Sequence, residues 1–313
     1  MIAFGPIPSR RLGKSLGINN IASHKICSYS CVYCQIGITR NKSEDRMAFY
    51  EPDLLFSEVE KHLLKLGKEN FPDYLTFVTN GEPTLDINLG KEIRLLKRLN
   101  IPVAVITNSS LLYDPLVREE LMEADWISVK VDGVVEEIWR KINQPLPSSD
   151  LGKILRGLEM FSLSYPGSLH TESMLLKGYN DSIPQLNQTA SLIATLNPEM
   201  AYLSVPTRPP ALKEVRPATS AFLAKAWNIF RDLNIQTELL TGFEGTGTGI
   251  TGNAYEDILN ITAVHPLRED TMTELLRKNK ADENVVHALT KQGIIKATHY
   301  KGKTYYIRSY HCK

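Results

Sequence analysis

Short runs of β-branched and apolar residues alternate with amphipathic stretches over most of this chain, and this alternation limits the folds open to it. The strand-like runs are 15–21, 74–79, 102–107, 126–131, 169–176, 200–205 and 235–240. Between them, apolar residues recur three and four positions apart near 53–67, 88–99, 114–124, 148–163, 183–197 and 217–233. Such alternation predicts an α/β fold with a parallel sheet and right-handed crossovers. About six units predict a partial (β/α)6 TIM-like barrel, because a complete barrel needs more chain.

The pattern changes after residue 241. Residues 242–253 contain five glycines, and Gly247, Gly249 and Gly252 match G-x-G-x-x-G. A dinucleotide site would need a further strand that ends in an acid about 20 residues on, but a helical pattern follows. We therefore expect a flexible linker, with a substrate-contacting loop as the alternative. The predicted domains are a barrel over 1–241, a glycine-rich linker over 242–253 and a small domain over 254–313.

Three short helices and a hairpin are predicted in the small domain. The helices lie near 255–264, 268–279 and 281–292, and the hairpin turns at Lys301-Gly302-Lys303. This order resembles a winged-helix module. No acid follows Glu283, whereas six cations do: Lys291, Lys296, Lys301, Lys303, Arg308 and Lys313. These cations predict either an RNA- or DNA-binding surface or a solvated face of a packing or dimerisation domain.

Composition and net charge exclude few classes of protein. The formal net charge is +1, so bulk charge favours no anionic partner. No apolar run is long enough to cross a membrane. Ser9-Arg10-Arg11 looks like a twin-arginine export signal, but polar residues interrupt the segment that follows. We expect a cytoplasmic protein with no membrane partner.

Three of the four cysteines, Cys27, Cys31 and Cys34, lie within eight positions, and Cys312 is far away. This clustering is unlike a disulfide framework and indicates a metal site. Three thiolates can bind three irons of a [4Fe–4S] cluster and leave the fourth iron open. Structural zinc would need a fourth ligand, such as His24 or Cys312.

The sequence Cys27-x3-Cys31-Val-Tyr33-Cys34 resembles the C-x3-C-x-aromatic-C signature of the radical S-adenosylmethionine (SAM) superfamily. The segments FGPIPSRRLGKSLGIN and CSYSCVYCQIG resemble a subgroup of iron–sulfur oxidoreductases related to the wyosine-type tRNA-modifying enzymes. The resemblance implies a [4Fe–4S] cluster on the three cysteines, SAM on the open iron, and a 5′-deoxyadenosyl radical that abstracts hydrogen from a substrate. It also implies an electron donor such as flavodoxin or ferredoxin.

The same resemblance implies SAM-binding residues near the cysteines. Tyr33 would lie beside the adenine, with packing at the barrel rim as the alternative. TNGEPTL, residues 79–85, resembles the superfamily's G-G-E-P motif, with Asn80 in place of the first glycine. Gly81, Glu82 and Pro83 would then contact the SAM amino group, and an ordinary strand-to-helix turn is the alternative.

Further candidates lie at the ends of the next two strands. Asn108 and Ser109 are expected to bind the ribose or carboxylate of SAM, or else to turn the chain and cap the next helix. Lys130 is expected to pair with the SAM carboxylate, and Asp132 to accept hydrogen bonds from the ribose. The alternatives are an ion pair between Lys130 and an acid of the protein, and a turn at Asp132.

Substrate contacts are expected at Glu172, Thr207 and Arg208, at the ends of the fifth and sixth strands; a surface ion pair is the alternative for Arg208. Arg10, Arg11 and Lys14 either face an anionic substrate or cover the bottom of the barrel.

The sequence thus predicts a radical SAM enzyme whose substrate is RNA, a protein or peptide, or a small molecule. The competing class is a non-enzymatic iron–sulfur redox sensor with a DNA-binding tail.

Overall fold

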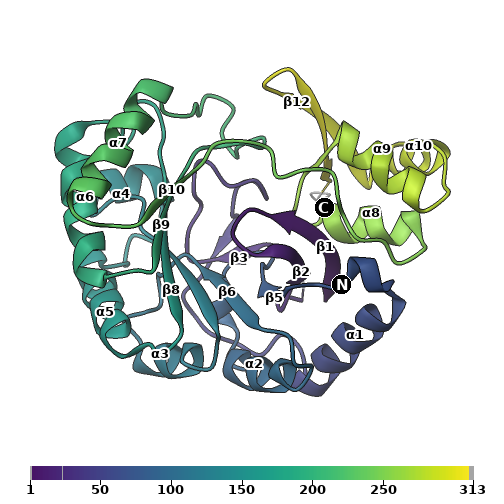
Figure 1. Ribbon diagram of the computed structural model, residues 1–313, viewed down its shortest axis with the longest axis horizontal. Coiled ribbons are helices and arrows are strands. Elements are labelled where there is room, and N and C mark those ends of the chain that lie inside the picture. Colours follow the sequence, from purple (N-terminus) through teal and green to yellow (C-terminus); the bar gives the residue numbers. More distant parts are fainter. Residues whose placement is uncertain (1, 23, 310–313) are drawn as a thin grey trace.

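The computed structural model describes residues 2–22 and 24–309 of the 313-residue chain, and its main feature is one curved sheet (Figure 1). The sheet order is β1-β2-β5-β6-β7-β8-β9-β10. From β2 to β10 neighbouring strands are parallel, whereas β1 is antiparallel to β2. Because β1 and β10 are the two edges, the barrel is open. The strands are β1 (Ala3–Ser9), β2 (Gly13–Ile18), β5 (Tyr74–Phe77), β6 (Val103–Thr107), β7 (Trp126–Lys130), β8 (Ser168–Met174), β9 (Met200–Ser204) and β10 (Thr237–Leu240).

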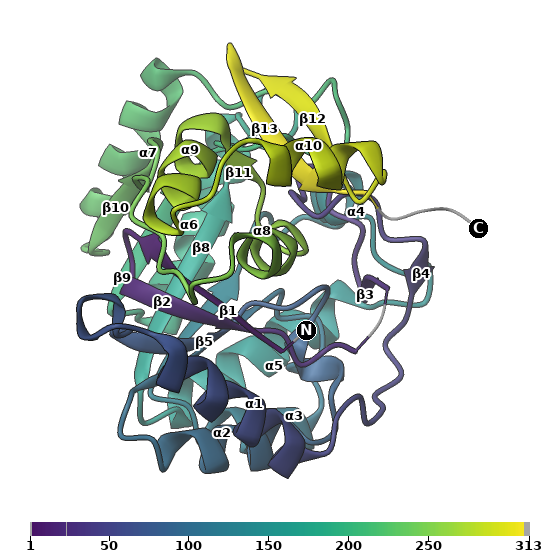
Figure 2. The ribbon, with the colours of Figure 1, turned by 90° about the vertical axis from the view of Figure 1, so that its right-hand side faces the viewer.

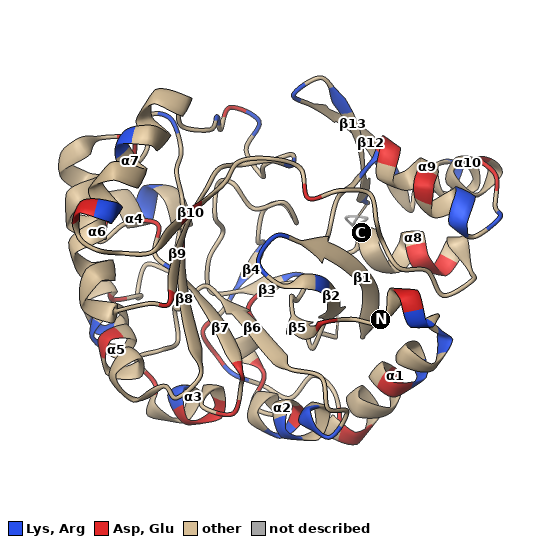
Figure 3. Cartoon of the chain, in the orientation of Figure 1, with Lys and Arg blue, Asp and Glu red and all other residues tan. Residues whose placement is uncertain are grey.

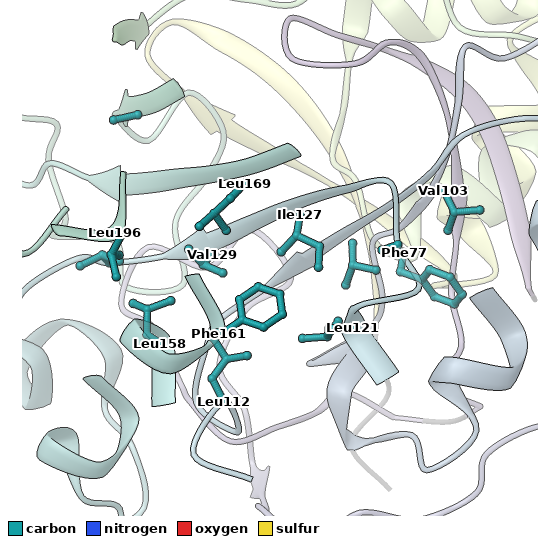
Figure 4. Packing of buried hydrophobic residues seen from close by; sticks show 14 of the residues in the cluster. Phe77, Val103, Leu112, Leu121, Ile127, Val129, Leu158, Phe161, Leu169 and Leu196 are labelled. Carbon is teal, nitrogen blue, oxygen red and sulfur yellow. The ribbon is translucent and has the colours of Figure 1, made fainter. Parts of the chain in front are cut away.

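Helices cover the outer face of this sheet (Figure 1). Phe161 and Leu158 of α5 belong to one apolar cluster with Ile127 and Val129 of β7 (Figure 4). Strand side chains alternate between faces, so Lys130 lies on the opposite, inner face. The helices are α1 (Pro52–Lys65), α2 (Leu89–Lys97), α3 (Pro115–Leu121), α4 (Glu136–Asn143), α5 (Leu151–Ser164), α6 (Ile183–Leu196) and α7 (Ser220–Asp232).

The predicted partial barrel is confirmed, and β1 and α4 are among the elements that the sequence analysis missed. β1 contains Pro6 and Pro8, which obscure its strand pattern but are tolerated because β1 is an edge strand. The eight-residue α4 is too short to give a clear period. In the described residues, no helix is long and apolar enough to span a membrane.

Residues 254–309 form a second, smaller group of elements, here called the C-terminal unit (Figure 2). Its sheet has the order β11-β13-β12. The predicted hairpin is observed, and its turn residues Lys301 and Gly302 both have positive φ. Its elements are α8 (Ala254–Thr262), β11 (Leu267–Arg268), α9 (Glu269–Lys278), α10 (Asn284–Lys291), β12 (Ile295–Tyr300) and β13 (Lys303–Arg308).

Two of the contacts between the C-terminal unit and the barrel lie at β1 and at the loop after β9. Phe4 of β1 is buried in the same apolar cluster as Ile258 of α8. Within the glycine-rich segment, Gly249 N–H donates to Pro6 O at 2.7 Å, and a Cβ on Gly249 would lie 2.3 Å from the Pro6 ring. At the other place, the hydroxyls of Tyr300 and Tyr305 donate to main-chain oxygens of residues 206 and 207, both at 3.0 Å. The segment 242–253 is therefore held against β1 at Gly249.

Candidate active site

The three cysteines lie on a loop between two very short strands, β3 (Ile26–Cys27) and β4 (Asn41–Lys42). The start of this loop is held by the 79–85 motif. Ile26 N–H donates to Asn80 O (3.2 Å), and Glu82 N–H donates to Ile26 O (3.1 Å). Gly81 between them has φ of 149°, and a Cβ there would lie 1.6 Å from Ile26 O. Only glycine fits this close approach, so the motif and the cysteine loop form one unit.

Each cysteine sulfur accepts a hydrogen bond from a side-chain nitrogen. Asn108 Nδ2 donates to Cys27 Sγ and Asn143 Nδ2 to Cys31 Sγ, both at 3.4 Å. Lys25 Nζ donates to Cys34 Sγ at 3.1 Å. Such bonds stabilise negative charge on sulfur and are the interactions that tune thiolate ligands of iron–sulfur clusters.

Burial opposes ionisation of the free thiols. It raises the pKa of Cys27 to about 12 and raises the pKa of Cys31 further. Burial also lowers the pKa of Lys25, but the neighbouring cysteine sulfurs outweigh burial and leave this pKa above its usual value. The loop therefore favours thiolates when positive charge lies close to the sulfurs, as bound iron provides.

The described residues contain no group of three or more His, Cys, Asp or Glu side chains placed around a single metal ion. A [4Fe–4S] cluster makes a different demand, because each cysteine binds its own iron atom. Three buried or half-buried thiols, each with a nitrogen donor, fit that demand. Cys312, considered above as a further zinc ligand, lies outside the described residues.

Glu82 connects the motif to the next strand end. Its side chain is 2% exposed and accepts four hydrogen bonds. The donors are Thr84 N (3.2 Å), Thr84 Oγ1 (2.8 Å), Thr107 Oγ1 (2.6 Å) and Asn108 N (2.7 Å). Burial raises the pKa of Glu82 despite these bonds. The carboxylate thus fixes Asn108, which in turn contacts Cys27.

Asp132 plays a similar part beside Tyr33. It accepts hydrogen bonds from the Tyr33 hydroxyl, from Asn143 Nδ2 (2.7 Å) and from Met174 N (2.8 Å). Asn143 therefore joins Asp132 to Cys31 Sγ. Lys130 Nζ lies 5.2 Å from the centre of the Tyr33 ring, a cation–π distance.

Lys130 also forms an ion pair inside the half-barrel. Its Nζ lies 2.8 Å from Glu172 Oε1, and Glu172 also pairs with Arg11 and accepts from Ser204 Oγ at 2.9 Å. Burial raises the pKa of Glu172, but Arg11 and Lys130 outweigh burial and bring it well below the usual range. The alternative of a Lys130–acid pair within the protein is confirmed.

The N-terminal basic segment contributes to the interior. Arg11 follows β1 and reaches Glu172 on β8, while the adjacent Leu12 is buried with Trp126 and Tyr202. Lys14 Nζ donates to Glu69 O at 2.5 Å. The contacts of Arg11 and Leu12 favour a role in closing the barrel interior over a role in facing substrate, whereas the Lys14 contact lies on the surface.

Four of the predicted cofactor residues, Asn108, Ser109, Lys130 and Asp132, line one cleft together with Trp139. Ser109 has φ of 69° and its hydroxyl donates to Lys130 O at 3.2 Å. The helix that follows is capped by Asp114, so neither Asn108 nor Ser109 caps it. Pro83 is buried and begins a single 3-10 turn, Pro83–Leu85.

Thr207 and Arg208 line a different cleft, next to the C-terminal unit. Arg208 is ion-paired with Glu244, as the alternative for this residue expected, but the pair is largely buried and not on the surface.

Sequence reasoning missed two residues at the cysteines. Lys25 stands two positions before Cys27, so its position carried a usable signal. Asn143 ends α4, more than a hundred residues from Cys31, and no local pattern identifies it.

Comparison with known proteins decides the family. The model of the radical SAM superfamily matches residues 21–190. The chain belongs to the radical SAM superfamily. Members of this superfamily are enzymes that generally use a [4Fe–4S] cluster and SAM, and this radical SAM protein is an enzyme too.

A UPF0026 protein of Methanocaldococcus jannaschii is 44% identical over 98% of this chain and 96% of its own length. The chain is therefore also a UPF0026 protein. A protein of Brachyspira hyodysenteriae named GTPase Obg is 32% identical over 92% of this chain, but the match covers 42% of that protein. Among solved structures, TYW1 with a lysine–pyruvate adduct bound has a TM-score of 0.54 at 16% identity, covering 71% of this radical SAM chain and 75% of that one. This last likeness concerns the fold.

Proposed function

We propose that this radical SAM enzyme holds a [4Fe–4S] cluster on Cys27, Cys31 and Cys34 and cleaves SAM reductively to abstract hydrogen from a substrate. The observation that carries the proposal is the set of three sulfurs, each with its own nitrogen donor, on a loop held by the 79–85 motif. The cluster and SAM together supply an electron and a 5′-deoxyadenosyl radical; the protein positions both and excludes water.

Each group of residues has a part in this proposal. Lys25, Asn108 and Asn143 stabilise the thiolates through their hydrogen bonds to sulfur. The main chain at Gly81, Glu82 and Pro83, the ring of Tyr33, and the cleft of Asn108, Ser109, Lys130 and Asp132 are proposed to bind SAM. Glu172, Thr207 and Arg208 are proposed to act on the substrate side, and a flavodoxin or ferredoxin is proposed to supply the electron.

The test uses protein purified anaerobically. We expect broad visible absorbance from the cluster, lost in Cys27→Ala, Cys31→Ala and Cys34→Ala and kept in Cys312→Ala. With dithionite and SAM, the wild type should release 5′-deoxyadenosine. An intact cluster that releases none would support the redox sensor instead, and loss of the absorbance in Cys312→Ala would contradict the three-ligand site.

RNA is the proposed substrate class, bound in part by residues 254–313 as a winged-helix-like domain beyond the 242–253 linker and the 1–241 barrel. Support comes from the cations at the tip of the β12–β13 hairpin (Figure 3). Lys301, however, donates to Pro206 O at 3.0 Å, so part of this charge serves contact with the barrel.

RNA and DNA binding should be compared across salt concentrations for the wild type and for Lys296→Gln with Lys303→Gln. Phosphate contacts predict that affinity falls steeply with salt and that the variant has a smaller slope. Equal, weak binding by both proteins would favour a peptide or small-molecule substrate.

A further inference from the structure

A second cleft lies where the barrel meets the C-terminal unit. Its walls come from the loop after β9, from the glycine-rich segment and from the start of α9. The residues used below are Arg208, Phe243, Glu244, Thr248, Arg268 and Thr271. The cleft shares no residue with the cleft of Asn108 and Lys130.

Two buried hydroxyls in this wall have no hydrogen-bond partner among the described residues. Thr248 is 1% exposed and Thr271 is 5% exposed, and both line the cleft. A buried hydroxyl without a partner is unfavourable, so two of them beside one cleft indicate that a polar ligand completes their bonding.

Two guanidinium groups lie in the same wall. Arg268 lies 3.2 Å from the centre of the Phe243 ring and forms an ion pair with Asp270 through both Nε (2.7 Å) and Nη2, which leaves Nη1 for a ligand. Arg208 pairs with Glu244 and donates to Gln35 Oε1 at 3.3 Å. Thr271 belongs to the first turn of the ten-residue α9, whose positive dipole end adds to the attraction for an anion. Asp270 and Glu269 oppose this attraction in part.

The Glu244 carboxylate already forms an ion pair with Arg208. Glu244 stands between Gly242 and Gly245, and Gly245 has φ of 106° with no atom within 4 Å of the point where a Cβ would lie. The glycines on either side leave the main chain here free to change conformation, which lets the Glu244 carboxylate move away from Arg208. Arg208 can therefore exchange Glu244 for an external anion.

We propose that this cleft binds a phosphate group of the substrate, with Arg208, Arg268 and the hydroxyls of Thr248 and Thr271 as donors and Glu244 as the group displaced. Phosphate matches the site better than a carboxylate does, because its oxygens can accept from two guanidinium groups and two hydroxyls at once. The proposal assigns phosphate as the chemical group that is recognised on the substrate side of the proposed function. It rests on the proposed function only for the reaction that the substrate undergoes.

The cleft also adjoins the cysteine loop. Gln35 follows Cys34, accepts from Arg208, and donates through Nε2 to Val264 O of the C-terminal unit at 2.9 Å. A phosphate on Arg208 would thus lie one side chain away from the loop that carries the cysteines.

The test is calorimetric titration of the anaerobic, cluster-containing protein with inorganic phosphate, and with acetate at the same ionic strength. We expect saturable binding of phosphate. Glu244→Gln should bind about tenfold more tightly because the competing carboxylate is gone, and Arg208→Gln should bind at least about tenfold more weakly. Thr248→Val with Thr271→Val, which keeps side-chain shape, should also weaken binding.

Arg231→Gln, which removes an exposed arginine of α7, is the matched control and should bind as the wild type does. Arg208→Lys keeps the charge and shows whether a loss in Arg208→Gln comes from misfolding, and thermal melting checks each variant. Absence of saturable phosphate binding in both wild type and Glu244→Gln, unchanged affinity in a folded Arg208→Gln, or tighter binding of acetate than of phosphate would overturn the proposal. SAM cleavage is measured separately, so its failure contradicts the proposed function while phosphate binding still decides the cleft.

Discussion

The sheet of the half-barrel and the cysteine loop beside it are stabilised in different ways. The sheet has regular ladders and an apolar layer in which Phe77 and Phe161 are fully buried. The loop between β3 and β4 has no helix or long strand, and polar side chains from distant segments, such as Asn108 and Asn143, contact its sulfurs. We infer that changes in the apolar layer act on the stability of the whole protein, whereas changes around the loop act first on the cysteines.

The largest effect is expected in the apolar layer. Phe161→Ala should lower the free energy of unfolding by about 3–5 kcal/mol, because a fully buried ring is replaced by a cavity. Urea denaturation measures it. The neighbouring Met160 is 56% exposed, and Met160→Ala should change stability by less than about 1 kcal/mol. Equal losses in both variants would contradict the assigned packing of α5.

The ion pairs inside the half-barrel are buried like the apolar layer and polar like the surroundings of the cysteine loop. Glu172→Gln tests them. The change leaves Arg11 and Lys130 buried without their carboxylate, and the expected loss is about 3 kcal/mol. The pKa of Glu172 is lowered in the folded protein, so its contribution is present above the unfolded pKa and is lost as pH falls through the folded one.

The wild type should therefore lose stability on acidification below about pH 4 more steeply than Glu172→Gln does. Glu58→Gln, at an exposed pair with Lys61, is the control and should change little. If the free energy of unfolding of Glu172→Gln falls on acidification as steeply as that of the wild type, the buried cations do not hold this carboxylate ionised.

Gly81→Ala tests the attachment of the cysteine loop. A Cβ at this position meets Ile26 O at 1.6 Å, so the motif must separate from the loop, at a cost of about 1–3 kcal/mol. Cluster absorbance should fall by more than overall stability suggests. Gly178→Ala is the matched control, because its φ is 76° but nothing lies within 4 Å of its Cβ position. If both variants keep full cluster content, the motif does not hold the loop in place.

The smallest effect concerns His170 on the inner face of β8. Its ring stacks on Trp126, and burial lowers its pKa to about 4. The unfolded chain binds a proton more readily, so stability is fully present above about pH 6.5 and falls toward pH 4. Between pH 7 and 5 the loss is at most about 2 kcal/mol.

His170→Phe keeps the stack and should reduce this slope in pH-dependent urea denaturation; part of the slope remains, because burial also lowers the pKa of His62 and of His265. His287→Asn, at an exposed histidine, should leave the slope unchanged. A slope in His170→Phe as steep as that of the wild type would assign the titration to the other groups.

The same contrast between the sheet and the cysteine loop explains which parts of the structure the sequence predicts. β7 and β9 were predicted to within one residue because their apolar runs are local and interrupted by turns. The Lys130–Glu172 pair spans 42 residues, and only the register of β7 on β8, which pairs these two residues directly, brings them together. Asn143 reaches Cys31 because of how α4 packs, which no spacing encodes. Local patterns thus predicted the sheet and located the cysteines, while the surroundings of the sulfurs needed the tertiary structure.

The burial of Phe4 against α8 has a consequence for biosynthesis. β1 leaves the ribosome before α8, and the apolar surface of α8 that covers Phe4 is made only after the whole barrel has been translated. Until then, the side of this ring that α8 covers stays open to water and to other nascent chains. Completion of this edge of the barrel therefore waits until α8 has been translated, about 250 residues after β1.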